Sequence, residues 1–468
     1  MDLPLTIKDA AAGLRAKTYS STELTKALLA KAKELNPTLG AFITFTEEGA
    51  LAAAATADAE LAAGTDRGPL QGIPMAIKDI IATADAPTTA NSLVLDRAWG
   101  AGYDATVIEK LRAAGAAITG KLVLNEFATG QPDPSKPFPM PQNPWDLPRS
   151  ASGSSSGTGI AVSSGMVLGG LGTDTGGSTR GPSSFNGISG IKQTFGRVSK
   201  FGCVPLGYSL DHINPMARSA YDCALILQVI AGYDPKDPTT VDVPVPDYVA
   251  ALTGSVKGVK IGVPMEYFFD SPQLDPEVRA AVLAAVEVLK GAGAIVTEVT
   301  VPHAAEAKDA NTIIIASEAG AYHRLDLQSQ FDQYGRFTSE SITRSVLFSG
   351  ADYVQAQRFR SYFKKAVAAV MEPLDVLITP TSIGTATLRA EMSPGKMLES
   401  PGFTGQWNLT GLPALAIPTG LSSNTLPMSM QIIGKPFAEA TVLAVGDAYQ
   451  RLTTHHLNVP PIAAGVAV

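Results

Sequence analysis

The chain has 468 residues and a formal net charge of -7, with 45% hydrophobic and 17% charged residues. This balance is typical of a folded α/β protein and excludes a disordered or coiled-coil chain. No block of basic residues occurs, so we expect no nucleic-acid partner. No run approaches the roughly 20 apolar residues of a membrane span, and the N-terminus lacks a secretory pattern. Two cysteines exclude a disulfide framework. We therefore expect a cytoplasmic protein that does not contact a membrane.

The first part of the chain predicts alternating helices and strands. Capping patterns indicate one helix near Thr6 and a second that is capped by Ser21 and ends at Asn36-Pro37. Residue type and stop signals then predict a strand over 41–45, a helix over 47–63, a strand over 72–80, a helix over 105–114 and a strand over 117–123.

The remainder continues this alternation after an irregular excursion. Residues 131–149 hold seven prolines and exclude regular structure. We predict helices over 220–232, 276–291 and about 438–452, and strands over 258–264, 294–300 and 375–381. Residues 303–372 read as mostly helical. They are rich in aromatic side chains, whose role in packing or in a substrate pocket stays open: Tyr322, His323, Phe331, Tyr334, Phe337, Phe348, Tyr353, Phe359, Tyr362 and Phe363.

The stretch from Arg149 to Arg180 is rich in serine and glycine but carries an apolar run over 160–172 that we expect to be a buried connector. Ser154 lies in one tight glycine-containing turn and Ser178 closes another. Glycine allows successive N–H groups to converge on one point, which beside a serine hydroxyl makes an oxyanion hole next to a nucleophile. The donors would come from Thr175, Gly176, Gly177 and Ser178. The alternative is a solvated linker.

A serine nucleophile needs a base within hydrogen-bond reach. The five histidines, among them His212 beside Asp211, lie in no GxSxG-type context, and we interpret Asp211-His212 as structural. Lys78 has an apolar flank, and burial lowers the pKa of a lysine enough for it to act as a base. Ser154 could relay a proton between Lys78 and Ser178. The alternative is that Lys78 pairs with Asp79 or another acid.

Several motifs in order resemble the amidase signature family over about residues 5–450. They are GIPMAIKD (72–79), the turn 153–157, GTDTGGS (172–178) with Arg180, SFNGISGIK (184–192) followed by FGRVS, the stretch 209–215 followed by MARS, and NLTGLPALAIP. Ser154 and Ser178 have the 24-residue spacing (178 minus 154) of the family's bridging serine and nucleophile.

The resemblance implies a Ser-cisSer-Lys triad, with Ser178 as the acylated nucleophile, Ser154 as the bridge on a cis peptide and Lys78 as the base. It implies a single domain over 1–468 with one large mixed β-sheet flanked by helices on both faces. The catalytic core would lie at about 70–215, and the variable pocket region at about 300–405. Ser155 and Asp174 would hold the loops, and Arg180 would be structural. No metal and no cofactor are expected.

The chain departs from the family pattern around the bridging turn. Ser152 and Ser156 occupy usual glycine positions and Thr158 a usual serine position. Each of these residues is small, so close backbone approach is retained. The role of the Ser156 hydroxyl stays open.

The resulting hypothesis is a serine hydrolase that cleaves C–N bonds of small-molecule amides or carbamates (urethanes, anilides) through an acyl-enzyme on Ser178, as a monomer or homodimer. Its overall character resembles the urethanase branch. The proline-rich loop 131–149, the aromatic segment 320–363 and Met-rich 392–403 would form an apolar pocket. The alternative is the amidase subunit of a tRNA-dependent amidotransferase, whose usual Tyr-rich run is replaced here by SGADYVQAQRFRSYF.

Overall fold

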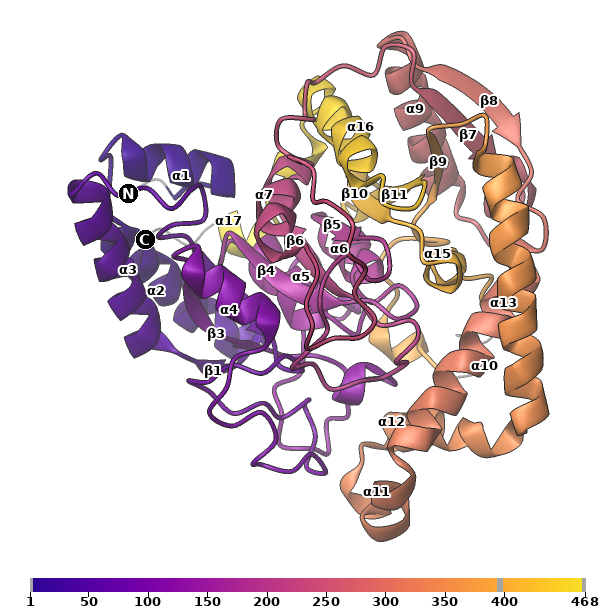
Figure 1. Cartoon of the computed structure of the whole chain (residues 1–468), viewed down its shortest axis with the longest axis horizontal. Coiled ribbons are helices and arrows are strands. Elements are labelled where there is room, and N and C mark those ends of the chain that lie inside the picture. The colour runs from indigo at the N-terminus through magenta and orange to yellow at the C-terminus, as the bar shows by residue number, and fades with distance from the viewer. Residues whose placement is uncertain (1–2, 394–398, 465–468) are drawn as a thin grey trace.

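The computed structural model describes residues 3–393 and 399–464, which build one large mixed β-sheet with helices on both faces (Figure 1). The sheet has 11 strands in the order β1-β3-β2-β4-β6-β5-β10-β11-β9-β7-β8. The predicted α/β class and the mixed sheet are therefore confirmed.

Strands from both halves of the chain meet in this sheet. β2 runs parallel to β3 and β4, and β7 runs parallel to β8 and β9, whereas the other neighbours are antiparallel. The strands are β1 (Phe42–Phe45), β2 (Pro74–Lys78), β3 (Ala117–Leu122), β4 (Gly169–Thr173), β5 (Ser189–Lys192), β6 (Ile213–Ala217), β7 (Lys260–Pro264), β8 (Ile295–Val299), β9 (Val376–Pro380), β10 (Ala414–Leu421) and β11 (Pro427–Gly434).

The longer helices with predicted bounds lie where the sequence places them, within a residue or two at most ends, and two more fall within 303–372, which reads as mostly helical. They are α1 (Ile7–Arg15), α2 (Ser21–Leu39), α3 (Glu47–Ala62), α4 (Thr106–Ala113), α7 (Ala220–Ile230), α9 (Pro276–Gly291), α10 (Ala304–Tyr322), α13 (Gly350–Met371) and α16 (Glu439–Leu452). Shorter ones include α5 (Ser156–Ser163), α6 (Arg180–Asn186), α11 (Arg324–Ser329), α12 (Arg336–Thr343) and α15 (Gly405–Thr410). The pair α10 and α13 forms one flank of the molecule, opposite α1 to α3 (Figure 1).

Two predicted details of α2 are wrong. Its N-cap is Ser20, whose hydroxyl accepts from Glu23 N–H while the Glu23 carboxylate accepts from Ser20 N–H. Its end is not at Pro37, because proline in the last turn removes only one helical hydrogen bond. The helix stops at Gly40, which adopts the left-handed conformation (φ 58°) and donates to the Asn36 carbonyl.

The run over 160–172 is almost entirely buried, as predicted, but it is not a simple connector. Its first part belongs to α5 and its last part to the central strand β4, so the run is buried but structured. Strands β5, β6, β10 and β11 are likewise absent from the strands that the sequence predicts.

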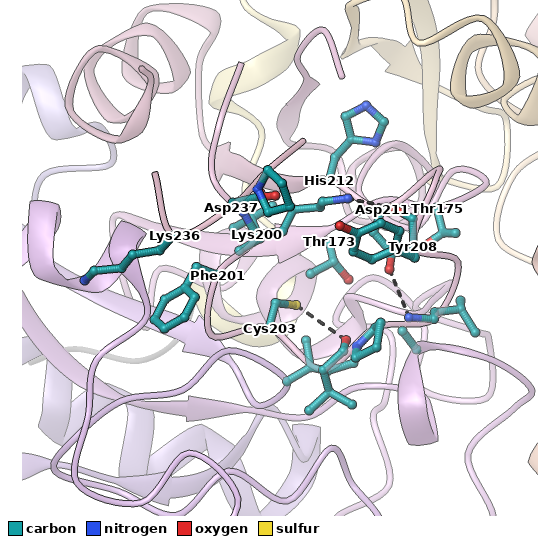
Figure 2. A pocket seen from close by; sticks show the side chains of 17 residues that line it. Thr173, Thr175, Lys200, Phe201, Cys203, Tyr208, Asp211, His212, Lys236 and Asp237 are labelled. Carbon is teal, nitrogen blue, oxygen red and sulfur yellow. Dashed lines mark hydrogen bonds between the residues drawn. The ribbon is translucent and has the colours of Figure 1, made fainter. Parts of the chain in front are cut away.

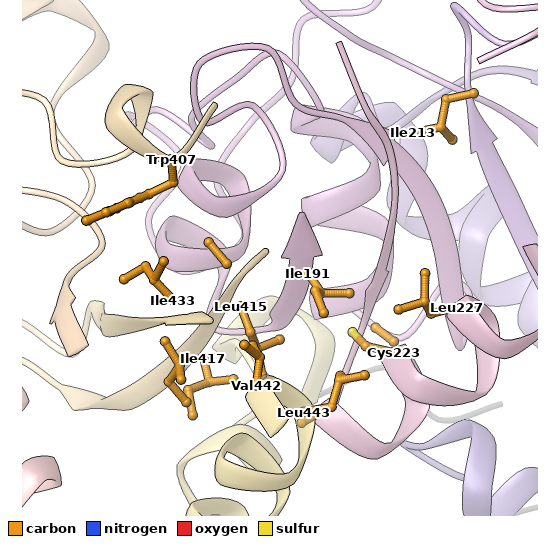
Figure 3. Close-up of a cluster of buried hydrophobic side chains, with 14 of the residues drawn as sticks. Ile191, Ile213, Cys223, Leu227, Trp407, Leu415, Ile417, Ile433, Val442 and Leu443 are labelled. Atoms are coloured by element: carbon orange, nitrogen blue, oxygen red, sulfur yellow. The ribbon is translucent and has the colours of Figure 1, made fainter. Parts of the chain in front are cut away.

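The hydrophobic core extends along both faces of the sheet. Around β5, β10 and β11, it joins Ile191, Leu415, Ile433, Val442 of α16 and Trp407 of α15 (Figure 3). All five side chains are fully buried. This packing fixes the central strands that carry the site. No helix in the described ranges is long and apolar enough to cross a membrane.

Candidate active site

Lys78 and Thr173 meet because two central strands are parallel. Lys78 ends β2 and Thr173 ends β4, and Ile77 pairs with Leu171 in their register. The carboxyl ends of parallel neighbours lie at the same edge of a sheet. Lys78 Nζ therefore donates to Thr173 Oγ1 at 2.7 Å.

Lys78 is fully buried among hydroxyl groups. Besides Thr173, its Nζ donates to Ser154 Oγ at 2.7 Å and to Ser155 Oγ at 3.0 Å. Burial lowers the pKa of Lys78 to about 7, against the weaker opposing effect of charges such as Asp174. A hydroxyl can accept from an ammonium and donate to a neutral amine, so these partners suit both protonation states.

The alternative pairing of Lys78 with Asp79 does not occur. Asp79 lies 3.0 Å from Nζ of Lys121, a second buried lysine on β3, and it also accepts from the hydroxyl and N–H of Thr89. Lys121 donates further to Thr88 Oγ1 at 2.8 Å. No carboxylate in the described ranges forms an ion pair with Lys78. Lys78 is thus available for proton transfer.

The turn that precedes α5 contains the expected cis peptide, between Gly153 and Ser154. Asn125 N–H donates to the Ser154 carbonyl at 3.1 Å and so ties this turn to the loop after β3. Ser155 N–H donates to the Ser178 carbonyl at 3.2 Å. The Ser155 hydroxyl also donates to the Thr173 carbonyl at 3.2 Å and accepts from its N–H at 3.1 Å. These bonds join both serine turns to β4.

The turn that ends at Ser178 contains several backbone N–H groups that a substrate could reach. Gly177 has φ 132°, and a Cβ there would overlap Thr404 Oγ1, so the position requires glycine. Its N–H donates to Asp174 Oδ1 at 2.7 Å and is therefore not available to a substrate. Within the described ranges, the N–H groups of Thr175, Gly176 and Ser178 make no hydrogen bond to the protein. Of the four N–H groups predicted as oxyanion-hole donors, these three remain candidates.

Asp174 and Arg180 form a fully buried ion pair beneath this turn. Two guanidinium nitrogens lie 3.0 Å from the two carboxylate oxygens. Burial alone would raise the pKa of Asp174, but the Arg180 charge more than offsets it and holds this pKa well below its usual range. Arg180 also donates to Asn408, Gln431 and the Thr404 carbonyl. It does not line the cavity into which the serines open.

The two serines at usual glycine positions differ. Ser152 adopts φ 60° and lines the cavity next to Ser154. Ser156 is fully buried at the first residue of α5, and its hydroxyl has no hydrogen-bond partner among the residues that the structure describes. Ser156 does not line the cavity, so no contact gives it a role in the site.

Ser154 and Ser178 open into the same cavity, of about 1310 Å³. The other walls come from residues 125–130, 272–276 and 381–404, the last within the part of this range that the structure describes. Apolar side chains include Leu274, Ile315, Ile383, Met392 and Phe403. The large, mainly neutral space is suited to an organic substrate of considerable size.

Charge in this cavity is unbalanced. Among the lining residues that the structure describes, the charged ones are Arg149, Asp275, Glu391 and Glu399. Arg149 donates to the Asp146 carboxylate at 2.8 Å and to the Ala386 carbonyl at 2.7 Å. Its charge is therefore already neutralised, and the three carboxylates would repel an anionic substrate.

The aromatic side chains of 320–363 do not line this cavity, which leaves the packing interpretation. Phe359 and Phe363 stack with ring centroids 5.9 Å apart, and His323 Nδ1 lies 2.9 Å from the Tyr334 hydroxyl, against the ring of Phe127. Of the proline-rich loop, Arg149 alone is among the lining residues described. In Met-rich 392–403, Met392 and Phe403 line the cavity, and Met397 lies outside the described residues.

A second, smaller cavity shares Ala128, Thr175 and Leu206 with the first. Figure 2 shows its lining, in which Thr175, Asp211 and His212 are labelled. Here Asp211 accepts from Thr175 Oγ1 at 2.5 Å and from the N–H groups of Leu206 and Gly207. His212 Nδ1 lies 3.1 Å from the Asp174 carbonyl oxygen, and burial lowers the pKa of His212 well below its usual range. These contacts agree with a structural role for both residues. No group of three potential metal ligands occurs in the described ranges.

Sequence reasoning missed three residues around the site. Thr173 contacts Lys78, Asn125 holds the Ser154 turn, and Thr404 donates to the Gly176 carbonyl at 2.6 Å. The parallel ends of β2 and β4 could have indicated Thr173 once β4 was recognised. Asn125 and Thr404 lie in irregular segments and give no sequence signal.

The fold and the comparisons with known proteins define the class of protein, an amidase-type hydrolase. The chain belongs to the amidase (amidase signature) family, whose model matches residues 23–443. It is 41% identical to a glutamyl-tRNA(Gln) amidotransferase subunit of Chloroflexus aurantiacus, over 97% of this chain and 98% of the relative.

Solved structures agree with this assignment. A glutamyl-tRNA(Gln) amidotransferase subunit of Thermotoga maritima is 32% identical, with a TM-score of 0.81 over 96% of each chain. The peptide amidase of Stenotrophomonas maltophilia is 29% identical, with a TM-score of 0.83 over 96% of this chain and 98% of that one.

Proposed function

We propose that this chain cleaves the C–N bond of a carboxamide or carbamate by acylating Ser178, with Ser154 as the proton relay and Lys78 as the base. The observation that carries the proposal is the buried Lys78, which forms no ion pair within the described part of the chain and is bonded to Ser154 at 2.7 Å. Its pKa of about 7 leaves a large neutral fraction at neutral pH, as a general base requires.

In the acylation step, neutral Lys78 takes a proton from Ser154, which takes one from Ser178. The Ser178 oxygen then bonds to the substrate carbonyl carbon, and the carbonyl oxygen becomes an oxyanion. The open N–H groups of Thr175, Gly176 and Ser178 are its donors. When the C–N bond breaks, the proton on Lys78 returns through Ser154 to the leaving nitrogen. Water then attacks the acyl-enzyme by the same route.

One candidate for the finer function is the amidase subunit of a tRNA-dependent amidotransferase. The 41% identity to a protein of that name, over nearly the whole of both chains, supports this candidate. The Thermotoga maritima structure supports it too. In that role the chain would act with partner chains and supply ammonia from a primary amide. The comparisons favour this candidate over the carbamate hydrolase.

The second candidate is a free-standing hydrolase of neutral amides, anilides or aryl carbamates. The cavity supports it, because its described charged residues are three carboxylates and one arginine already paired with Asp146. Such a cavity favours an uncharged acyl group over one that carries a free carboxylate. The likeness to a peptide amidase, at 29% identity, also supports this candidate.

A release assay on the purified single chain separates the two candidates. Wild type and Ser178→Ala are incubated with glutamine, neutral primary amides, anilides and aryl carbamates, and released ammonia or arylamine is measured. Turnover of anilides or carbamates by the chain alone supports the hydrolase. Ammonia release from glutamine only in the presence of partner chains supports the amidotransferase candidate. Equal rates for wild type and Ser178→Ala would refute the nucleophile assignment.

A further inference from the structure

The peptide group between Gly176 and Gly177 is held at both ends. Its carbonyl, on Gly176, accepts from Thr404 Oγ1 at 2.6 Å. Its N–H, on Gly177, donates to Asp174 Oδ1 at 2.7 Å. Because a peptide group is planar, two opposed hydrogen bonds fix the orientation of the whole unit.

Thr404 is itself anchored to the same ion pair. Its carbonyl accepts from Arg180 Nη1 at 3.1 Å, and Arg180 pairs with Asp174. Asp174, the Gly176–Gly177 peptide, Thr404 and Arg180 therefore form a closed ring of hydrogen bonds. The Thr404 side chain also packs directly on Gly177, where there is no space for a Cβ.

The peptide groups on either side of the Gly176–Gly177 peptide carry N–H groups that are candidate oxyanion donors. The N–H of Gly176 precedes it and the N–H of Ser178 follows it, and neither has a protein partner among the described residues. Adjacent peptide planes share a Cα atom, so a rotation of the middle plane would turn the donors on both sides. Oxyanion donors stabilise a transition state only when their orientation is fixed in advance.

We propose that Thr404 is a positioning residue for the oxyanion turn: its hydroxyl fixes the Gly176–Gly177 peptide and thereby the N–H groups of Gly176 and Ser178. This inference rests on the proposed function. Thr404 itself lines the cavity, together with residues 402 and 403. One segment therefore both bounds the substrate space and orients the donors.

The test compares Thr404→Val, which keeps the β-branched shape and removes the hydroxyl, with Thr404→Ser, which keeps the hydroxyl. The substrate is a neutral anilide that wild type cleaves and Ser178→Ala does not. For Thr404→Val we expect kcat to fall about 10- to 100-fold, somewhat less than for loss of an oxyanion donor, while KM changes less than about threefold. Thr404→Ser should restore kcat to within about threefold of wild type.

Thr410→Val is the matched control, because it removes a buried hydroxyl at the other end of α15 whose partners among the described residues are helix carbonyls. Its kcat should stay close to wild type. Wild-type kcat in Thr404→Val, or equal losses in Thr404→Ser and Thr404→Val, would overturn the inference. So would loss of the cooperative unfolding transition in Thr404→Val, since the inference gives this hydroxyl no role in folding. An active Ser178→Ala enzyme would instead overturn the proposed function.

Discussion

The substitution Thr173→Val should shift the pH dependence of activity in a defined direction. Thr173 Oγ1 accepts from Lys78 Nζ at 2.7 Å, and this hydrogen bond stabilises the ammonium more than the neutral amine. A hydrogen bond to a charged group contributes about 1.5–3 kcal/mol, of which the neutral amine retains part. Since one pKa unit corresponds to about 1.4 kcal/mol, its loss should lower the pKa of Lys78 by about one unit.

The assay is kcat/KM for a neutral anilide between pH 5 and 9. In wild type, the neutral base is lost as pH falls through about 7, so the rate should fall roughly tenfold per unit below that. In Thr173→Val, this acid limb should move to about pH 6, whatever the maximal rate becomes. Thr119→Val is the control. The Thr119 hydroxyl, on β3, is also buried, but it donates to the Met75 carbonyl of β2 and not to Lys78. An acid limb that stays at 7, or moves to higher pH, would refute the reasoning.

Two further predictions concern stability. Lys78→Met should abolish activity yet raise the free energy of unfolding at pH 7 by about 1–3 kcal/mol, because the folded state no longer buries a group whose pKa falls from 10.5 to about 7. The gain should shrink as pH rises towards 10.5, and urea unfolding at pH 7 and 9.5 measures it; a gain that grows with pH would contradict this explanation. Arg180→Met should destabilise the fold by about 3–5 kcal/mol at pH 7, because Asp174 is left buried and unpaired. The depressed pKa of Asp174 contributes stability that is present above its usual pKa and lost below it, so the loss measured in urea should diminish as pH falls below about 4.

Long helices and the three strands at each end of the sheet could be predicted because their residues suit their structure. α3 is rich in alanine, and α9 begins with an Asp-Pro cap. The five strands between them, β4, β6, β5, β10 and β11, could not be predicted in this way. β4 reads Gly-Gly-Leu-Gly-Thr, which lacks β-branched residues apart from its last position. Its glycines are set by packing, since a Cβ on Gly170 would lie 2.6 Å from the Ala76 carbonyl oxygen. Tertiary packing therefore overrides local propensity in this strand.

The residues of the site likewise divide into those that the sequence indicates and those that only the structure reveals. Glycine turns, an apolar flank and the family spacing indicate Lys78, Ser154 and Ser178, and the structure brings Lys78 and Ser154 into contact. The assignment of Gly177 as an oxyanion donor fails because its N–H is used by Asp174, which only the geometry of the turn reveals. The substrate walls come from segments far apart in the chain, such as 272–276 and 381–404, and share no pattern that a sequence could indicate.

The most direct test of the account is to identify the acylated residue. Wild-type protein is mixed with an activated aryl carbamate, quenched in acid after a fraction of one turnover, digested and mapped by mass spectrometry. The account predicts a single acyl mass on the peptide that contains Ser178, absent in Ser178→Ala and formed far more slowly in Lys78→Ala. An acyl group on Ser154, or turnover in Ser178→Ala, would contradict it.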